Sequence, residues 1–133
     1  MAKISVFIIT KNEADRILSV LNSVKIFADE IIVIDSGSID DTQKIANKFG
    51  AKVIFNEWQG FGQQKIFGEK ECQNDWILNI DADEEISSQL AQEILHLKES
   101  TKFNNFYGYK IKIVNKFRFE DRPKKWAYYY NQL

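Results

Sequence analysis

Four carboxylates lie within five positions, at Asp81, Asp83, Glu84 and Glu85, directly after the apolar run at 76–80. Like charges this close raise one another's pKa, so the arrangement favours a positive partner among them. In an extended chain, residues two apart point the same way, so Asp81 and Asp83 can face one ion. Carboxylate oxygens suit magnesium or manganese, and magnesium takes one or two protein carboxylates while water and phosphate complete its shell.

The same acids have a structural interpretation. Negative charge is favourable in a turn that leads into the N-terminal end of a helix, and Glu84 and Glu85 fit that role. For Asp81 and Asp83 the sequence leaves both interpretations open, a metal site and a helix-capping turn.

A second polar cluster, "DSGSIDD" at residues 35–41, offers the same choice. Ser38, Asp40 and Asp41 are ordinary residues for the start of a helix, and we interpret them that way. Asp35 ends an apolar run, and we expect it to point into a crevice where a base or ribose donates hydrogen bonds to it.

A third segment, "GFGQQK" at residues 60–65, resembles a dinucleotide-binding loop but lacks its third glycine, since Lys65 stands in that place. The GxxxxGK[ST] phosphate loop is also missing from the sequence. A nucleotide site in this chain would therefore neutralise phosphate with a metal and with side chains such as Lys65. The alternative for Lys65 is a residue on the surface of a helix.

The whole-chain numbers narrow the class of protein. A chain of 133 residues with 44% hydrophobic and 28% charged residues is typical of one soluble globular domain. Its formal net charge of -1 gives no attraction to nucleic acid. The single cysteine, Cys72, excludes an internal disulfide and fits a reducing compartment, and with one histidine, His96, it makes a zinc site improbable. The apolar run at 4–9 is too short to span a bilayer, so we expect a cytoplasmic protein.

Predicted strands and helices alternate along the chain, and they would position the three polar clusters. Continuous apolar runs rich in β-branched residues predict buried parallel strands, and helical spacing of apolar residues predicts helices between them. The predicted strands are 4–9, 30–35, 51–55 and 75–81. The four predicted helices begin at Asn12, at about residue 42, after Gly62, and at Ser87 or Ser88. Gly50 is the predicted end of the second helix.

This order is typical of a mostly parallel α/β sheet with right-handed connections and helices on both faces. In such sheets ligands bind beyond the carboxyl ends of the strands. The clusters at 10–13, 35–41 and 81–85 all follow strands, so we expect them to converge on one crevice.

Four segments in this order, "FIITKNEADRI", "EIIVIDSGSIDDT", "WQGFGQQK" and "WILNIDADEEIS", resemble the inverting family 2 glycosyltransferases of the GT-A fold. Within that family the chain is most similar to bacterial lipopolysaccharide-core glucosyltransferases. The resemblance covers residues 4–97 and implies a Rossmann-like domain that binds a nucleotide-diphosphate sugar, expected to be a UDP-sugar. It implies transfer of a hexose, expected to be glucose, with inversion, to a core saccharide or another glycan or lipid-linked acceptor.

The resemblance also implies roles for single residues. Thr10, Asn12 and Glu13 would line the nucleotide pocket, Asp35 would contact uracil or ribose, and Lys65 would lie against the base or the diphosphate. Asp81 and Asp83 would form the DxD element that holds Mn²⁺ or Mg²⁺, with Asp83 as the direct ligand and Asp81 also contacting the nucleotide sugar.

The chain departs from the family pattern at two points. Ile66 stands where family members have an asparagine after the basic residue. Family members are also considerably longer, with their catalytic base and acceptor-binding parts beyond the DxD strand. Glu120 and Asp121 superficially resemble the family's downstream acidic pair, and they are weak candidates for the catalytic base.

Three functions therefore remain open at this stage. The first is a metal-dependent hexosyltransferase. The second is a truncated nucleotide-sugar-binding module without transfer activity, and measured transfer or slow donor hydrolysis would separate the two. The third is a flavodoxin-like signalling domain with Asp35 as phosphate acceptor. The glycine and serine residues that follow Asp35 argue against this third function.

The C-terminal residues 116–133 are rich in basic and aromatic side chains. We place the nucleotide-sugar domain at 1–115 and a basic, aromatic tail at 116–133, which is either solvated or in peripheral contact with the inner face of the membrane. The run "FYGYKIKIV" at 106–114 alternates like an antiparallel or edge strand. An exposed edge there would pair with a second copy, so we predict a homodimer.

Overall fold

The computed structural model describes residues 1–114 and 128–130. Its elements are β1 (Ile4–Thr10), α1 (Ile17–Val24), β2 (Glu30–Asp35), α2 (Thr42–Phe49), β3 (Lys52–Phe55), α3 (Phe61–Glu71), β4 (Trp76–Asp81), α4 (Ser88–Glu99), the 3-10 turn η1 (Phe103–Asn105), β5 (Lys112–Val114) and β6 (Tyr128–Tyr130). The chain forms two compact units, Met1–Phe103 and Asn104–Leu133. This division falls before the boundary that we placed at 115/116.

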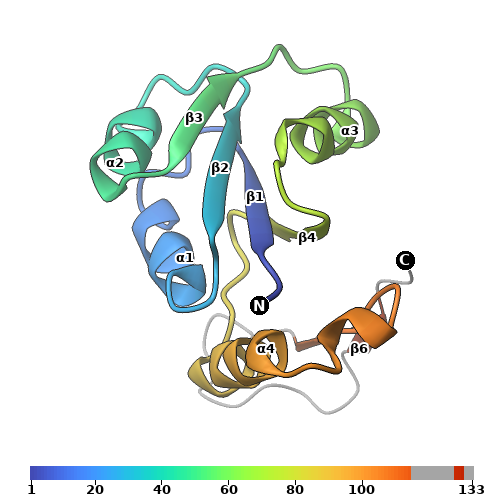
Figure 1. Ribbon diagram of the computed structural model, residues 1–133. Coiled ribbons are helices and arrows are strands. Elements are labelled where there is room, and N and C mark those ends of the chain that lie inside the picture. Colours follow the sequence, from blue (N-terminus) through green and yellow to red (C-terminus); the bar gives the residue numbers. More distant parts are fainter. Residues whose placement is uncertain (115–127, 131–133) are drawn as a thin grey trace. The chain divides into compact units, whose positions relative to one another are not determined.

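The first unit contains a four-stranded sheet in the order β3-β2-β1-β4, and all of its strand pairs are parallel. The predicted α/β architecture is confirmed, and the observed strands match the predicted ones within one residue at either end. Helices α1 and α2 lie on one side of the sheet and α3 lies on the other (Figure 1). The carboxyl ends of β1, β2 and β4 therefore lie next to one another at one end of the sheet.

Alternation along β1 sends successive side chains to the two faces of the sheet. Phe7, Ile9, Ile32 and Ile34 form a core cluster. Phe67, which lies in α3, and Cys72, the residue directly after α3, pack against this cluster. The α1 side is lined by Val6, Ile8 and Val33, all fully buried with the apolar face of α1. The sheet is thus covered on both faces, as its continuous apolar strands require.

Helix α3 approaches the sheet closely at Gly68. A Cβ at this position would lie 2.7 Å from Phe7 Cε2, so the helix depends on a residue without a side chain there. This contact fixes the distance of α3, and of Lys65 one turn earlier, from the strands.

Helix ends follow the sequence in two places. Gly50 ends α2 with a φ of 103°, a left-handed conformation that favours glycine. Ser87 caps α4, because its side chain accepts a hydrogen bond from the backbone N–H of Leu90 at 3.1 Å.

The expectation for the first helix was wrong. Asn12 does not cap it, since α1 begins at Ile17 and Asn12 has a φ of 53°. Asn12 and Glu13 instead form hydrogen bonds with Ser38, Ile39 and Thr42, which follow β2. In α4 the buried residues are Ala91 and Lys98, whereas Leu97 is 39% exposed.

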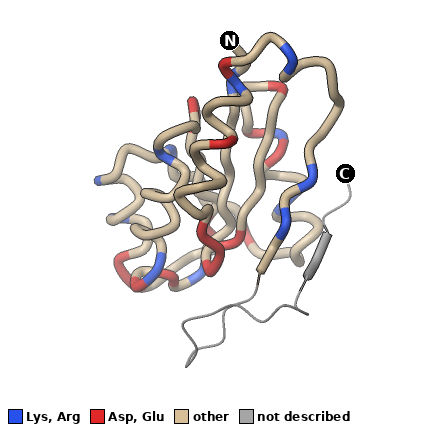
Figure 2. The backbone as a smooth tube through the Cα atoms, turned by 90° about the horizontal axis from the view of Figure 1, so that it is seen from below, with Lys and Arg blue, Asp and Glu red and all other residues tan. Residues whose placement is uncertain are grey.

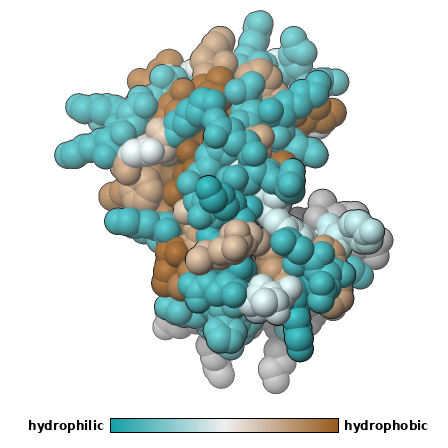
Figure 3. All heavy atoms as spheres, in the orientation of Figure 1, coloured by the Kyte–Doolittle hydropathy of each residue, from teal (hydrophilic) through white to brown (hydrophobic). Residues whose placement is uncertain are grey.

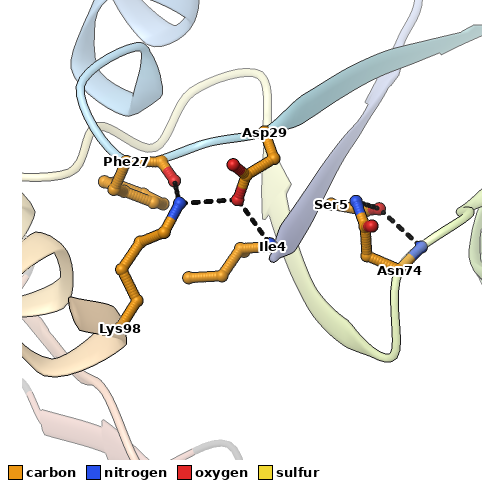
Figure 4. Close-up of polar contacts among 6 residues, drawn as sticks. All are labelled: Ile4, Ser5, Phe27, Asp29, Asn74 and Lys98. Carbon is orange, nitrogen blue, oxygen red and sulfur yellow. Dashed lines mark hydrogen bonds and ion pairs between the residues drawn. The ribbon is translucent and has the colours of Figure 1, made fainter. Parts of the chain in front are cut away.

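Lys98 is buried, and its ammonium group lies beside Phe27 and Asp29 near the starts of β1 and β2 (Figure 4). Its Nζ donates to the carbonyl oxygen of Phe27 at 2.8 Å and to Asp29 Oδ2 at 2.5 Å. The same Asp29 oxygen accepts the backbone N–H of Ile4 at 2.8 Å. One ion pair therefore ties the last turn of α4 to the starts of β1 and β2.

In the second unit, β5 pairs antiparallel with β6 in a separate two-stranded sheet. The predicted strand at 106–114 is confirmed only for its last three residues, and its antiparallel pairing lies within this chain. The predicted homodimer and membrane contact stay predictions. Residues 115–127 and 131–133 lie outside the described residues, and they include Glu120 and Asp121.

Positions of basic and acidic residues are interspersed along the described backbone (Figure 2), in keeping with the net charge of -1. Among the described residues, no helix has the length and apolar character needed to cross a bilayer.

Candidate nucleotide-sugar site

The loops that follow β1 and β2 are joined by polar contacts across about twenty-six residues of sequence. The backbone N–H of Asn12 donates to Ser38 Oγ at 2.8 Å, and the Asn12 side chain accepts the backbone N–H of Ile39 at 2.9 Å. Next to them, the N–H of Glu13 donates to Thr42 Oγ1 at 2.8 Å. Asn12 has a φ of 53°, outside the helical region, and these bonds hold the segment after β1 against the loop after β2, so α1 begins only at Ile17.

Asp35 is the centre of this loop pair and is fully buried. Its Oδ1 accepts hydrogen bonds from the hydroxyls of Thr10 and Ser38, at 2.8 and 2.6 Å. Its Oδ2 accepts from the backbone N–H groups of Gly37 and Ser38, at 2.9 and 2.7 Å, and from Gln43 Nε2 at 2.7 Å. These five hydrogen bonds occupy the full acceptor capacity of the Asp35 carboxylate.

These bonds decide the protonation of Asp35. Burial acts against the charged carboxylate, but the hydrogen bonds from Ser38, Thr10 and Gln43 outweigh it and hold the pKa of Asp35 below its ordinary value. The structure therefore shows Asp35 as the ionised organiser of two loops, with its oxygens directed into the protein. The expected contact of Asp35 with uracil or ribose stays a prediction.

Thr10, Asn12 and Glu13 lie where the sequence placed them, at the carboxyl end of β1. The hydroxyl of Thr10 points to Asp35, as described, and Asn12 is exposed. Glu13 Oε2 lies 3.0 Å from Arg16 Nε in an ion pair. Of these three residues Asn12 is the most accessible to a ligand.

Lys65 and Asp81 come together from α3 and from the end of β4. Lys65 Nζ lies 3.6 Å from Asp81 Oδ1, and the two side chains are 44% and 41% exposed. The Asp81 oxygen is itself enclosed by protein atoms and accepts no hydrogen bond. A partly exposed ion pair at this distance is weak, so an incoming charged ligand can exchange with either partner.

The other acids of the cluster divide into structural and open positions. Glu84 Oε2 accepts the backbone N–H of Asp81 at 2.8 Å, and Glu85 accepts a hydrogen bond from the hydroxyl of Ser19. Burial, together with the nearby charges of Asp81 and Asp83, raises the pKa of Glu84. Asp83 is exposed. Glu84 and Glu85 thus make hydrogen bonds that hold the turn before α4, whereas Asp81 pairs with Lys65 and Asp83 is exposed.

The donor set fits a divalent cation bound together with a ligand. The enclosed Asp81 oxygen without a hydrogen-bond donor is a position that a cation would satisfy, and Asp83 follows two residues later. Within residues 1–114 and 128–130, no group of three or more histidine, cysteine or acidic residues is arranged to hold a metal alone. Two carboxylates completed by phosphate oxygens and water are the arrangement that magnesium usually adopts.

The strand register separates the predicted site residues into two groups. Asp81 pairs with Ile9, whose side chain packs on the α3 face of the sheet. Asp35 pairs with Thr10 one residue further along, so both point to the α1 and α2 face. The clusters meet at one end of the sheet as expected, but Lys65 and Asp81 face one side of it and Thr10 and Asp35 face the other.

Two residues that we did not single out from the sequence lie beside the Lys65 group. Trp58 and Phe61 contact each other at right angles, with 4.8 Å between ring centroids, although they are 46% and 68% exposed. The available signal was two aromatic residues in the turn-rich segment "EWQGFG", where no strand or helix periodicity explains them.

The fold and the site together define a class. A parallel sheet with helices on both faces, polar loops at the carboxyl ends of its strands, and a paired lysine and aspartate there is typical of α/β domains that bind phosphorylated ligands. The family model described as glycosyl transferase family 2 matches residues 5–133. The chain belongs to this family.

Curated relatives agree. An uncharacterized glycosyltransferase of Rickettsia felis is 51% identical over 127 residues, which cover 96% of this chain and 45% of that protein. The lipopolysaccharide core biosynthesis glycosyltransferase LpsC of Rhizobium meliloti is 32% identical over 94 residues, covering 67% of this chain and 34% of that protein. The chain thus spans less than half the length of these relatives.

Among solved structures, glucosyl-3-phosphoglycerate synthase from Mycobacterium tuberculosis is 32% identical, with a TM-score of 0.56 over 62% of this chain and 34% of that one. It was solved in complexes with Mn²⁺, UDP-glucose and phosphoglyceric acid, and with Mg²⁺ and UDP. This similarity confirms the Rossmann-like GT-A fold. Family membership and the burial of Asp35 speak against the signalling-domain alternative, which needs an accessible Asp35.

Proposed function

We propose that the chain is the donor-binding part of a metal-dependent, inverting glycosyltransferase that uses a nucleotide-diphosphate sugar, and that the nucleotide is uridine diphosphate. The observation that carries the proposal is the Lys65 and Asp81 pair at the end of β4, with 3.6 Å between Nζ and Oδ1 and an enclosed oxygen on Asp81 that has no hydrogen-bond donor.

In this proposal the pair separates when the donor binds. Lys65 turns to the diphosphate, while Asp81 and Asp83 hold the divalent cation, Mn²⁺ or Mg²⁺. When bound, the cation supplies positive charge that offsets the negative charge building on the diphosphate leaving group. Glu84 keeps the turn between the two aspartates in shape through its bond to the Asp81 N–H.

The loops after β1 and β2 act as a rigid wall of the same site. Asp35 holds Thr10, Gly37 and Ser38 in fixed positions, so that the exposed Asn12 is presented at the carboxyl end of β1. Fixing these groups before the donor arrives lowers the entropy lost on binding.

We further propose that the sugar is a hexose, namely glucose, and that the acceptor is a lipopolysaccharide core saccharide or a related lipid-linked glycan. The names of two similar proteins support this: one is called a lipopolysaccharide core biosynthesis glycosyltransferase, and the other was solved with UDP-glucose. Transfer requires a base that takes the proton of the acceptor hydroxyl. The weak candidates Glu120 and Asp121 lie outside the described residues.

The test is calorimetric titration of the full chain with UDP, with and without Mn²⁺ or Mg²⁺. The variants are Asp83→Asn and, as a matched control, Asp75→Asn, an exposed aspartate at the opposite end of β4. We expect UDP binding that depends on the metal, is weakened at least tenfold by Asp83→Asn, and is unchanged by Asp75→Asn. A wild-type chain that binds no UDP under any of these conditions would refute the proposal.

Transfer is assayed separately, by incubating the chain with UDP-glucose and the metal and measuring released UDP. Release above the rate without protein supports a transferase that hydrolyses its donor slowly when no acceptor is present. Binding without release would leave the donor-binding role and remove the claim of transfer for this chain by itself.

A further inference from the structure

The connection between β3 and α3 exposes aromatic side chains that the fold does not need. Trp58 is 46% exposed and Phe61 is 68% exposed, and in α3 the residues buried against the sheet are Gln64 and Gly68. Apolar spheres reach the surface over the region of α3 (Figure 3). Exposed aromatic side chains that do not serve the core are a common feature of binding sites.

The aromatic pair is held in place. Gly60 enters α3 with a φ of 105°, and Gln64, which is buried, accepts a hydrogen bond from Asn56 Nδ2 at 2.8 Å and donates to the Asn56 carbonyl at 3.3 Å. The backbone N–H of Asn56 in turn donates to the carbonyl of Asp35 at 2.9 Å. The segment that carries Trp58 is therefore anchored at both ends, and the two rings contact each other at 88°.

The pair adjoins the candidate site. Phe61 and Lys65 are four residues apart in α3, so they lie on the same face with about 6 Å between their Cβ atoms. Lys65 reaches Asp81 at the end of β4. The rings thus begin one helical turn beyond the position proposed for the diphosphate.

The sheet order indicates which end of the donor meets them. β3, which leads into the aromatic pair, and β4, which leads into the acidic turn, are the two edge strands, with β2 and β1 between them. The reacting end of the donor belongs at the acidic turn, where charge on the leaving group is offset. The group at the other end of a nucleoside diphosphate is its base, a flat ring that stacks on aromatic side chains.

Asp35, the residue expected to bind the base, accepts five hydrogen bonds from the protein and is buried. We propose that Trp58 and Phe61 form the platform on which the nucleobase of the donor stacks. This inference rests on the proposed function. The exposed Glu57 beside Trp58 makes an anionic lipid surface an unfavourable occupant.

The experiment titrates the full chain with three probes in the presence of Mg²⁺: UDP, UDP-glucose and inorganic pyrophosphate. The variants are Trp58→Ala, Phe61→Ala and the conservative Trp58→Phe. Phe106→Ala is the matched control, since Phe106 is 58% exposed and also contacts an aromatic ring, Tyr109, in the other compact unit. Thermal unfolding establishes that each variant is folded.

We expect Trp58→Ala to weaken UDP and UDP-glucose equally, by about 5- to 150-fold, the usual effect of losing one base-stacking ring. Pyrophosphate binding should be unchanged, Trp58→Phe should restore most of the affinity for UDP, and Phe106→Ala should have no effect.

Other results overturn the inference. A loss confined to UDP-glucose would assign the rings to the hexose, and an equal loss for pyrophosphate would mean that they only support the loop. Unchanged binding of all three probes would assign the pair to another partner. If the wild-type chain binds none of the three probes, the proposed function itself fails. The wild-type titration alone shows this, whereas failure of the stacking inference is seen only by comparing wild type with the variants.

Discussion

Lys98 Nζ lies 2.5 Å from Asp29 Oδ2 and joins the last turn of α4 to the connection before β2 (Figure 4). The Lys98 side chain is only 5% exposed, whereas that of Asp29 is 31% exposed. Burial works against ionisation of Asp29, but the hydrogen bonds from Lys98 and from the Ile4 N–H outweigh it and lower the pKa of the carboxyl. Asp29 is therefore ionised at neutral pH, and removing Lys98 leaves this carboxylate without its ion-pair partner.

The first prediction concerns this pair. Lys98→Met keeps the length of the side chain but leaves Asp29 and the Phe27 carbonyl without their donor. We expect the free energy of unfolding to fall by about 2 to 3 kcal/mol, which is less than for a completely buried pair because Asp29 is partly exposed. Urea unfolding followed by circular dichroism measures it. The control is Lys102→Met, an exposed lysine, and equal stabilities for the two variants would contradict the prediction.

The sequence predicted the elements of the first unit because its local patterns agree with its packing. The runs at 4–9 and 31–34 are almost entirely apolar, and in the structure β1 is buried along its whole length and β2 over its last four residues. Gly50 and Ser87 end and begin helices through bonds within a few residues of each other in the chain. Signals of this kind can be read without knowledge of distant contacts.

The sequence was less informative where contacts between residues far apart in the chain determine the structure. Asn12 looks like a helix cap, but its side chain bonds to Ile39, and no periodicity reveals that partner. No pattern in the sequence singles out Lys98, because its partner Asp29 lies 69 positions away in the chain and the two meet only in the folded protein. The register turns the Asp35 side chain towards Thr10 and α2, and the strand pattern alone does not reveal these partners; its contact with a base or ribose stays a prediction. The meeting of Lys65 and Asp81 could be anticipated only because family resemblance placed both in one site.

The second prediction concerns acid and Asp35. Its pKa in the folded chain lies below the ordinary value of 3.8, so as the pH falls the unfolded chain takes up the proton first. The stabilisation from this carboxylate is complete above about pH 5 and is lost as the pH falls through the lower, folded value. Asp35→Asn should therefore be less stable than wild type at pH 7, and its free energy of unfolding should fall less steeply below about pH 4.

Urea unfolding at a series of pH values between 7 and 3 tests this expectation. Asp75→Asn, at an exposed position, is the control and should follow the wild-type curve. If Asp35→Asn loses stability below pH 4 as steeply as wild type does, the hydrogen-bonded carboxylate is not the source of acid sensitivity.

The third prediction compares two glycines of α3. A Cβ on Gly68 meets the Phe7 ring, at 2.7 Å from Cε2, whereas a Cβ on Gly62 has no atom within 4 Å. Alanine favours a helix over glycine by about 1 kcal/mol, and overpacking a core costs about 1 to 3 kcal/mol. Gly62→Ala should therefore leave the chain as stable or up to about 1 kcal/mol more stable, while Gly68→Ala should destabilise it.

Thermal unfolding of both variants gives the comparison. The double variant Gly68→Ala with Phe7→Leu should recover part of the loss, because the smaller side chain makes room for the new methyl group. An increase in stability for Gly68→Ala alone would show that α3 moves away from the sheet without cost.

The fourth prediction concerns the thiol of Cys72. Burial, together with the negative charges of Glu30, Glu69 and Glu71, raises the pKa of the Cys72 thiol to about 11, from an ordinary value of 9.0. Its Sγ donates to the carbonyl of Gly68 at 3.3 Å. Only the thiolate is nucleophilic, so alkylation by iodoacetamide at pH 8 should be about 100-fold slower in the folded chain than in urea. Equal rates, measured by mass spectrometry, would contradict this protection.

The last prediction separates the two roles assigned to Lys65. In the free chain its ammonium group lies 3.6 Å from Asp81 Oδ1 and competes with any cation there, whereas in the donor complex we place it on the diphosphate. Lys65→Met should therefore strengthen the binding of Mn²⁺ alone and weaken the binding of UDP in saturating Mn²⁺ by roughly tenfold, the loss of one partly exposed charged contact. Lys70→Met, an exposed lysine later in α3, should change neither.

Titration of Mn²⁺ followed by electron paramagnetic resonance, and calorimetry with UDP, measure the two affinities on the same samples. If the changes came only from removing a positive charge, Lys70→Met would also change the affinities for Mn²⁺ and UDP, and the changes would disappear at high salt. If Lys65→Met weakens Mn²⁺ and UDP together, the lysine supports the shape of the metal site instead of exchanging between Asp81 and phosphate. Opposite changes in the two affinities are the result that only a lysine shared between aspartate and diphosphate produces.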